Sequence, residues 1–325
     1  MTTSNYTPAQ IAGMSTSVIA ALSTDIIQGF TFTQVAALTA TQAKALTVGE
    51  MSALTTANVV GLSTAAVAAL GSDQLAALAT AAVGKLGSAQ IGALSVAAIP
   101  GLSAAEVAAQ IGSFKPAQIA AVGTDAISGL STAQVTALST ATVAALSTAQ
   151  VAQGLTATQV AVLSSGQVAA LSAAQARALT ADELSALTTA NVVGLSTAAV
   201  AALGSDQLAA LSSADILHLT STQLLALTSQ TIPVLTSGEI QAVGSAVLSA
   251  LSTAQFAAIT TDAIQGLTTS EMTNLTTKEI AAFTTDQINA LTTTAIGGLT
   301  TTQTGAFTNA QIAGMTDQQR TNIFG

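Results

Sequence analysis

Few residues of this sequence could do chemistry, and none of them stands in a catalytic pattern. His218 is the only histidine, and a nucleophilic triad would need a serine and a carboxylate placed around it. Asp182 and Glu183 are adjacent, so on a helix they point in different directions and do not form a general acid/base pair. The chain has no cysteine, which excludes disulfides and thiolate metal sites. The sequence therefore predicts no catalytic, cofactor-binding or metal-binding residue, and no enzyme activity.

Charge and composition exclude further classes of site. Calcium loops need several oxygen ligands close together, and neither that spacing nor a glycine-rich phosphate loop is present. Six basic residues and a net charge of −9 exclude ordinary nucleic-acid binding. Only 6% of residues are charged, against about 25% in typical soluble domains, and no charged residue lies between Asp125 and Arg177. Such a bland exterior favours self-association into a homo-oligomer or polymer, glycan attachment, or burial against other surface proteins.

The main feature is a repeat of eight residues. Thirty-nine consecutive copies run from Tyr6 to Asn322, reading roughly L-[ST]-[ST]-x-[QDE]-[IV]-x-[AG], and we number these positions one to eight. The register breaks twice, at four extra residues in 110–113 and one extra residue in 153–154, which we assign to Gly154. We therefore predict one continuous repeat array over 6–322, preceded by an N-terminal tail at 1–5 and followed by a C-terminal end at 323–325.

The octad suits one short capped helix followed by a turn. In a continuous helix, positions one and six would lie about 140° apart and give no apolar stripe, and in a strand they would face opposite sides. As a capped helix, Ser or Thr at position two accepts from the amide of position five, and Gln or Glu there reaches back, as in LSTAQV from Leu146. Positions one and six then form a hydrophobic staple across the helix start.

The acidic residues support this interpretation because fourteen of the fifteen fall in the first turn of the predicted helices, at positions four or five. Only Asp317 departs from this pattern. We interpret the acidic balance mainly as a consequence of helix capping. The fourteen are Asp25, Glu50, Asp73, Glu106, Asp125, Asp182, Glu183, Asp206, Asp215, Glu239, Asp262, Glu271, Glu279 and Asp286.

The units from Ile259 onward nearly all open with Thr-Thr. One hydroxyl per unit is expected to cap the helix, while the next is free to point outward in a regular array. Such an array is compatible with simple capping, with O-glycosylation, or with an ice-binding face, although curved helical stacking does not readily provide the flat surface that the last function requires.

We therefore predict an all-α solenoid of about 39 octads. Leu at position one and Ile or Val at position six should line its interior, and small residues at position eight should allow close packing of successive turns. The insertion near Gln110 should give a longer helix or a bulge. Arg320 replaces the apolar sixth residue of the last full unit, which predicts a terminal cap or a subunit contact.

The units LSTAQVAA and LTTxQIxA resemble the short octapeptide repeats of very large bacterial surface proteins, often described as adhesins or haem-utilisation/adhesion proteins. The resemblance covers practically the whole chain and implies a secreted or surface-exposed structural protein with no active site to carry over. Haem binding is not expected, because His218 stands alone. No classical signal peptide is visible at MTTSNYTPAQ, and no run of about 18 apolar residues predicts a membrane span.

We therefore expect a non-enzymatic structural protein at the bacterial cell surface or outside the cell, either a filament-forming subunit or the stalk of an adhesin. The alternative is a binding scaffold that uses one face of the repeat array for a glycan, a peptide or an ice surface. Concentration-dependent mass would distinguish a polymer from isolated molecules.

Overall fold

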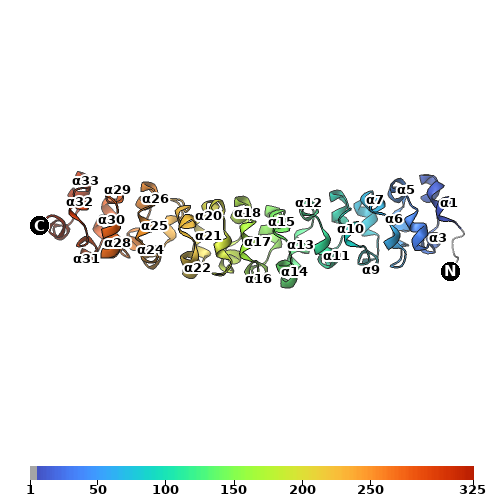
Figure 1. The fold of residues 1–325 in the computed structure, drawn as a ribbon, viewed down its shortest axis with the longest axis horizontal. Helices are drawn as coiled ribbons and strands as arrows, with labels where there is room; N and C mark the ends of the chain where they lie inside the picture. Colours follow the sequence, from blue (N-terminus) through green and yellow to red (C-terminus); the bar gives the residue numbers. More distant parts are fainter. Residues whose placement is uncertain (1–5) are drawn as a thin grey trace. The chain divides into compact units, whose positions relative to one another are not determined.

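The computed structural model describes residues 6–325 and divides the chain into two compact units, Met1–Val162 and Leu163–Gly325. The predicted tail, residues 1–5, lies outside the described residues. Within each unit, short helices and tight turns follow one another in a solenoid, and residues 6–325 contain no β-strand (Figure 1). The prediction of an all-α repeat solenoid is confirmed.

Nearly every octad of the first unit forms one helix of four to seven residues. Its α-helices (α), 3₁₀ helices and one π-helix (both η) are α1 (Pro8–Gly13), α2 (Thr16–Ile19), α3 (Thr24–Gln28), α4 (Phe32–Ala36), α5 (Ala40–Ala45), α6 (Val48–Ser52), η1 (Val59–Gly61), α7 (Thr64–Ala68), α8 (Ser72–Ala76), α9 (Thr80–Val83), α10 (Ser88–Ile91), η2 (Val96–Gly101), α11 (Ala104–Gln110), η3 (Ile111–Ser113), α12 (Pro116–Ile119), α13 (Thr124–Ser128), α14 (Thr132–Thr136), α15 (Thr140–Ala144), η4 (Gln150–Gly154) and α16 (Ala157–Ala161).

The second unit continues the same pattern and ends in a longer helix that runs through the predicted C-terminal end to Phe324. Its helices are α17 (Ser165–Ala169), α18 (Ala173–Ala178), α19 (Ala181–Ser185), η5 (Val192–Gly194), α20 (Thr197–Ala202), α21 (Ser205–Ala210), α22 (Ser213–His218), α23 (Ser221–Leu225), η6 (Ile232–Val234), α24 (Ser237–Val243), α25 (Ser245–Leu248), α26 (Thr253–Ala257), α27 (Thr261–Ile264), α28 (Thr269–Asn274), α29 (Thr277–Ala282), α30 (Thr285–Ala290), α31 (Thr293–Ile296), α32 (Thr301–Thr304), α33 (Asn309–Gly314) and α34 (Asp317–Phe324).

The predicted capping boxes start many of these helices. In α5, the Thr39 hydroxyl accepts from the Gln42 amide at 3.3 Å, and Gln42 Oε1 accepts from the Thr39 amide at 2.9 Å. These two bonds satisfy amides that have no partner in the first turn of a helix. A helix this short is not stable alone, so its stability must come from packing.

Positions one and six supply that packing, as predicted. Leu46 and Met51, for example, are 3% and 0% exposed. Phe256 at position six meets Phe283 at position one, four octads later, edge to face with ring centroids 4.9 Å apart. The two apolar positions therefore form one continuous core within each unit.

Three to four octads complete one turn of the solenoid. Helix α5 packs against both α2 and α7, whose first residues lie three octads before and after its own. In the second unit, α18 packs against α20 in the same way. Within each unit, successive turns of the solenoid therefore lie in contact, as in other solenoids.

Some position-eight glycines lie where the backbones of two turns touch. A Cβ on Gly101 would fall 2.1 Å from Ser72 O, and one on Gly194 would fall 2.1 Å from Ser165 O. No side chain fits at that distance, so these positions require glycine. A Cβ on Gly13 would meet nothing within 4 Å, so close approach does not explain every glycine at this position.

Both irregular units keep the core intact. The four-residue insertion lengthens α11 to seven residues and adds η3, which confirms the predicted longer helix. The single extra residue near Gly154 is accommodated in the π-helix η4. A π-helical turn holds one more residue than an α-helical turn, so it absorbs an insertion without moving the next octad.

Candidate functional site

Position five, which the sequence analysis assigned to capping, also joins successive turns. Gln42 Oε1 caps its own helix, while Gln42 Nε2 donates to Ile11 O at 2.7 Å and Met14 O at 2.8 Å. Those carbonyls belong to the preceding turn, 31 and 28 residues earlier. Gln42 is only 2% exposed, so one buried amide closes a helix start, supplies the donor that Met14 O otherwise lacks, and adds a second donor to Ile11 O, which also accepts from the Met14 amide.

The same contact recurs through both units, and we call it the glutamine ladder. Its donors reach carbonyl oxygens 24 to 32 residues earlier in the chain and mostly occupy position five. They are Gln34, Gln42, Asn58, Gln74, Gln90, Gln110, Gln118, Gln134, Gln150 and Gln159 in the first unit, and Asn191, Gln207, Gln223, Gln255, Gln287, Gln303, Gln311 and Gln319 in the second.

A signal for the ladder was present in the sequence. Gln and Glu serve a capping box equally well, because each needs only one acceptor oxygen. Gln nevertheless outnumbers Glu at position five by eighteen to six. That excess follows from the Nε2 donor, which a carboxylate lacks.

The acidic residues at positions four and five lie in different environments. Asp182 at position four is exposed, while Glu183 at position five is 3% exposed. Burial raises the pKa of Glu183 above its ordinary value; the Thr180 amide and hydroxyl lower it in part, and the neighbouring Asp182 raises it. In Glu271 burial also acts to raise the pKa, but hydrogen bonds from the Thr268 hydroxyl and amide outweigh it and bring the net pKa below its ordinary value.

Glu50 shows that a carboxylate at position five leaves one buried oxygen without a hydrogen-bond partner. Its Oε2 accepts from the Thr47 amide at 2.6 Å, which leaves Oε1 in the place that Nε2 takes in a glutamine. Oε1 is buried and has no hydrogen-bond partner. By the register of the ladder it faces the carbonyls of Ile19 and Leu22, which are acceptors as well, so this step of the ladder has no donor.

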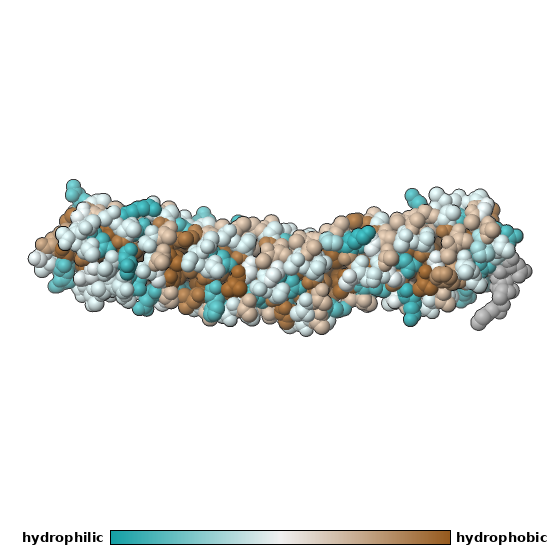
Figure 2. Space-filling view, in the orientation of Figure 1, coloured by the Kyte–Doolittle hydropathy of each residue, from teal (hydrophilic) through white to brown (hydrophobic). Residues whose placement is uncertain are grey.

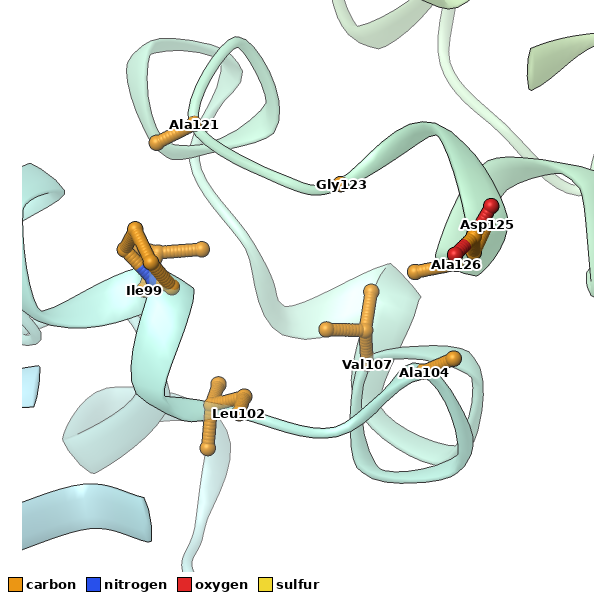
Figure 3. A pocket seen from close by; sticks show the side chains of 9 residues that line it. Ile99, Leu102, Ala104, Val107, Ala121, Gly123, Asp125 and Ala126 are labelled. Atoms are coloured by element: carbon orange, nitrogen blue, oxygen red, sulfur yellow. The ribbon is translucent and has the colours of Figure 1, made fainter.

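A cavity of about 300 Å³ opens beside the inserted segment. Figure 3 shows Ile99 and Leu102, from η2 and the turn after it, across the cavity from Val107 of α11 and Ala126 of α13. The lining is apolar apart from backbone groups and one exposed carboxylate, that of Asp125. The full set of lining residues is Ile99, Pro100, Leu102, Ala104, Val107, Ala121, Gly123, Asp125 and Ala126.

The cavity coincides with a gap in the ladder. After the insertion, Gln118 Nε2 donates to Ile91 O and Leu94 O, each at 2.8 Å and 27 and 24 residues earlier. One octad further on, the same register pairs position 126 with the carbonyls of Ile99 and Leu102. Position 126 is alanine, so no side-chain amide reaches those carbonyls. This cavity could have been sought in the sequence as a missing position-five amide just after an insertion.

The residues that could have done chemistry are not brought together. His218 is exposed on α22, and its Nδ1 lies 2.7 Å from Ala214 O of the same helix. Asp182 and Glu183 point to different environments, as described above. Within residues 6–325 no three or more His, Asp or Glu side chains gather as metal ligands.

Arg320 binds a carbonyl pair of the kind that ladder glutamines bind elsewhere. Its Nη1 donates to Met315 O at 2.9 Å and lies 3.5 Å from Ile312 O, while Nη2 pairs with Asp317. These two carbonyls occupy the same octad positions, six and one, as the Ile11 and Met14 carbonyls that Gln42 binds. The role of Arg320 as a terminal cap or a subunit contact stays a prediction.

The exterior carries few charged side chains. On the face drawn in Figure 2, hydrophilic residues are scattered singly among pale and brown ones rather than gathered into a patch. Among residues 6–325, no helix has the length and apolar character needed to cross a membrane.

The repeat identifies the family. The ALTTAQ repeat matches residues 45–80, 108–140, 180–213, 232–269, 269–301 and 280–317, more than half of the chain. The chain belongs to the ALTTAQ repeat family. No curated protein matches it. A solved leucine-rich repeat-containing protein, LegL7 from Legionella pneumophila, is 11% identical over 67% of this chain and 78% of that one, with a TM-score of 0.16, too low to support an argument.

Proposed function

We propose that this ALTTAQ repeat protein is a non-enzymatic structural protein, either a filament-forming subunit or the stalk of a bacterial cell-surface or extracellular adhesin. The glutamine ladder is the observation that carries the proposal. Buried amides such as Gln42 and Gln303 make the same two contacts to the preceding turn in widely separated octads. Because each turn makes the same contacts to the turn before it, further octads can be added without a different kind of core. This property suits a structural protein built from many repeats.

The exterior also supports a structural role. Position-five amides use their hydrogen bonds inside the solenoid, so the surface is left mainly to small, neutral side chains and scattered charges. Neutral repetitive surfaces associate more readily than highly charged ones. Lateral contact between copies, or burial against another surface protein, follows naturally from this composition.

Electron microscopy across a concentration series, combined with analytical ultracentrifugation, tests the filament form of the proposal. Ordered filaments whose mass grows with concentration would support a polymer subunit. Single molecules at all concentrations would exclude that form and leave the stalk. Protease treatment of intact cells that make the protein then tests the stalk, because a protein that stays uncut until the cells are lysed is not on the surface.

A binding scaffold is the second candidate, and the cavity beside α11 is the observation that favours it. The threonine array offers less support for an ice surface. Within this array, the Thr269 hydroxyl donates to Thr294 O at 3.1 Å, so this hydroxyl is engaged within the solenoid.

A further inference from the structure

We propose that the cavity beside the inserted segment binds a small primary ammonium compound, an alkylammonium whose charged head takes the place of the missing ladder amide. This inference goes beyond the proposed structural function and does not depend on it. It rests on the hydrogen-bonding character of the cavity, its size and its one charged side chain.

The cavity lining has two carbonyls with room for another donor and one amide, that of Gly123, to which no described residue offers an acceptor. Ile99 O accepts from the Leu102 amide at 3.0 Å, which leaves one lone pair. No described residue donates to Leu102 O. In the neighbouring octad the corresponding carbonyls, of Ile91 and Leu94, each receive a hydrogen from Gln118 Nε2. By the same register a position-126 amide would bind the carbonyls of Ile99 and Leu102, and Ala126 supplies no such donor.

Charge decides which donor fits best. Asp125 adjoins Ala126, is exposed, and is the only charged residue that lines the cavity. The whole chain carries a net charge of −9. A primary ammonium has three N–H donors, enough for the two carbonyls and the Asp125 carboxylate, and a charge-assisted hydrogen bond is stronger than a neutral one. A neutral primary amide could pair with the carbonyls and with the Gly123 amide, but it would gain nothing from the Asp125 charge.

The rest of the lining suits a short apolar tail. Ile99 and Val107 are buried, Pro100 adds an apolar ring that has no amide hydrogen, and Ala104 and Ala121 leave room because their side chains are small (Figure 3). The volume of about 300 Å³ lies at the lower end of the range for small-molecule sites. An alkyl chain of four carbons could therefore contact the apolar wall while its head stays at the carbonyls.

Methyl NMR of the full chain with n-butylammonium chloride as the probe tests the proposal. We expect saturable shifts of the Ile99, Leu102 and Val107 methyl signals, with a dissociation constant on the order of a millimolar for so small a ligand. Butan-1-ol has the same tail without the charge, and tetramethylammonium has the charge without N–H donors. Both should bind at least threefold more weakly.

Two variants locate the site. Ala126→Gln restores the ladder amide and fills the cavity, so it should abolish the shifts while unfolding at the same or a higher urea concentration than wild type. Ala82→Gln makes the same change at position five, five octads earlier in the chain and outside the cavity lining, and should leave binding unchanged. Asp125→Asn should weaken n-butylammonium at least threefold without affecting butan-1-ol.

Three results would overturn the proposal. No saturable shift with n-butylammonium would exclude the site. Equal binding of butan-1-ol would show an apolar cavity with no preference for a cation. Shifts that persist in a folded Ala126→Gln variant would place the ligand elsewhere.

Discussion

Replacing Gln42 with Glu should weaken the solenoid although the capping box survives. The carboxylate can still accept from the Thr39 amide, as Oε1 does at 2.9 Å. It cannot donate to Ile11 O and Met14 O, which lie 2.7 and 2.8 Å from Nε2. The substitution therefore removes the contact between turns and leaves the start of the helix nearly unchanged.

The size of the effect follows from the two lost bonds. Each bond contributes about 0.5–1.5 kcal/mol net, so the loss of both costs about 1–3 kcal/mol. The introduced carboxylate oxygen that replaces Nε2 is buried without a donor and adds a further cost of about 1–3 kcal/mol. We expect Gln42→Glu to lower the free energy of unfolding by about 2–6 kcal/mol at pH 7. At pH 4 the introduced carboxyl can keep its proton and donate one hydrogen bond, so the loss should fall by about half.

Gln10 provides a matched control. It also occupies position five, and its Oε1 accepts from the Thr7 amide at 2.8 Å, but it is exposed, and its Nε2 makes no hydrogen bond to another turn among residues 6–325. Gln10→Glu therefore changes the same atoms without touching the ladder. Its effect should stay within about 0.5 kcal/mol, as for other surface substitutions.

Urea unfolding followed by circular dichroism compares the two variants with wild type at pH 7 and pH 4. Because solenoid turns can unfold separately, amide hydrogen exchange between Ile11 and Gln42 shows where the loss occurs. If Gln42→Glu and Gln10→Glu behave alike, the Nε2 contacts contribute nothing to stability and the ladder is only a geometric coincidence.

Three further predictions follow from individual side chains. Burial raises the folded pKa of Glu183. The stabilising contribution of its protonated form is therefore full below the unfolded pKa of about 4.3 and is lost as pH rises through the folded pKa. Glu183→Gln should raise the urea midpoint at pH 7 and leave it unchanged at pH 3. Gly101→Ala places a Cβ 2.1 Å from Ser72 O and should lower the free energy of unfolding by about 1–3 kcal/mol. The Cβ of Gly112→Ala meets nothing within 4 Å, so thermal unfolding should show this control variant to be nearly as stable as wild type. Val151→Asp buries a charge at a site that is 0% exposed and should cost several kcal/mol, seen as faster hydrogen exchange around the π-helix; an unchanged melt would contradict the inward placement of position six.

Much of this fold was legible in the sequence because its signals are local. A capping box spans four residues, as at Thr39 to Gln42, and the hydrophobic staple spans six, so the start of a helix can be recognised within a single octad. The inward placement of positions one and six followed from the same pattern, and so did the longer helix at the insertion near Gln110.

Only the tertiary structure decided how the octads stack, because stacking depends on contacts between residues that are far apart in the chain. The sequence does not state that Gln42 meets Ile11 and Met14, since those contacts depend on how many octads complete a turn. The buried position of Glu50, the close approach of Gly101 to Ser72 and the cavity at Ala126 also depend on contacts between residues far apart in the chain, so they could not be located from the sequence. Each of these features arises where one turn passes over another, and the position of that crossing is set by small backbone rotations accumulated over three to four octads rather than by any local signal.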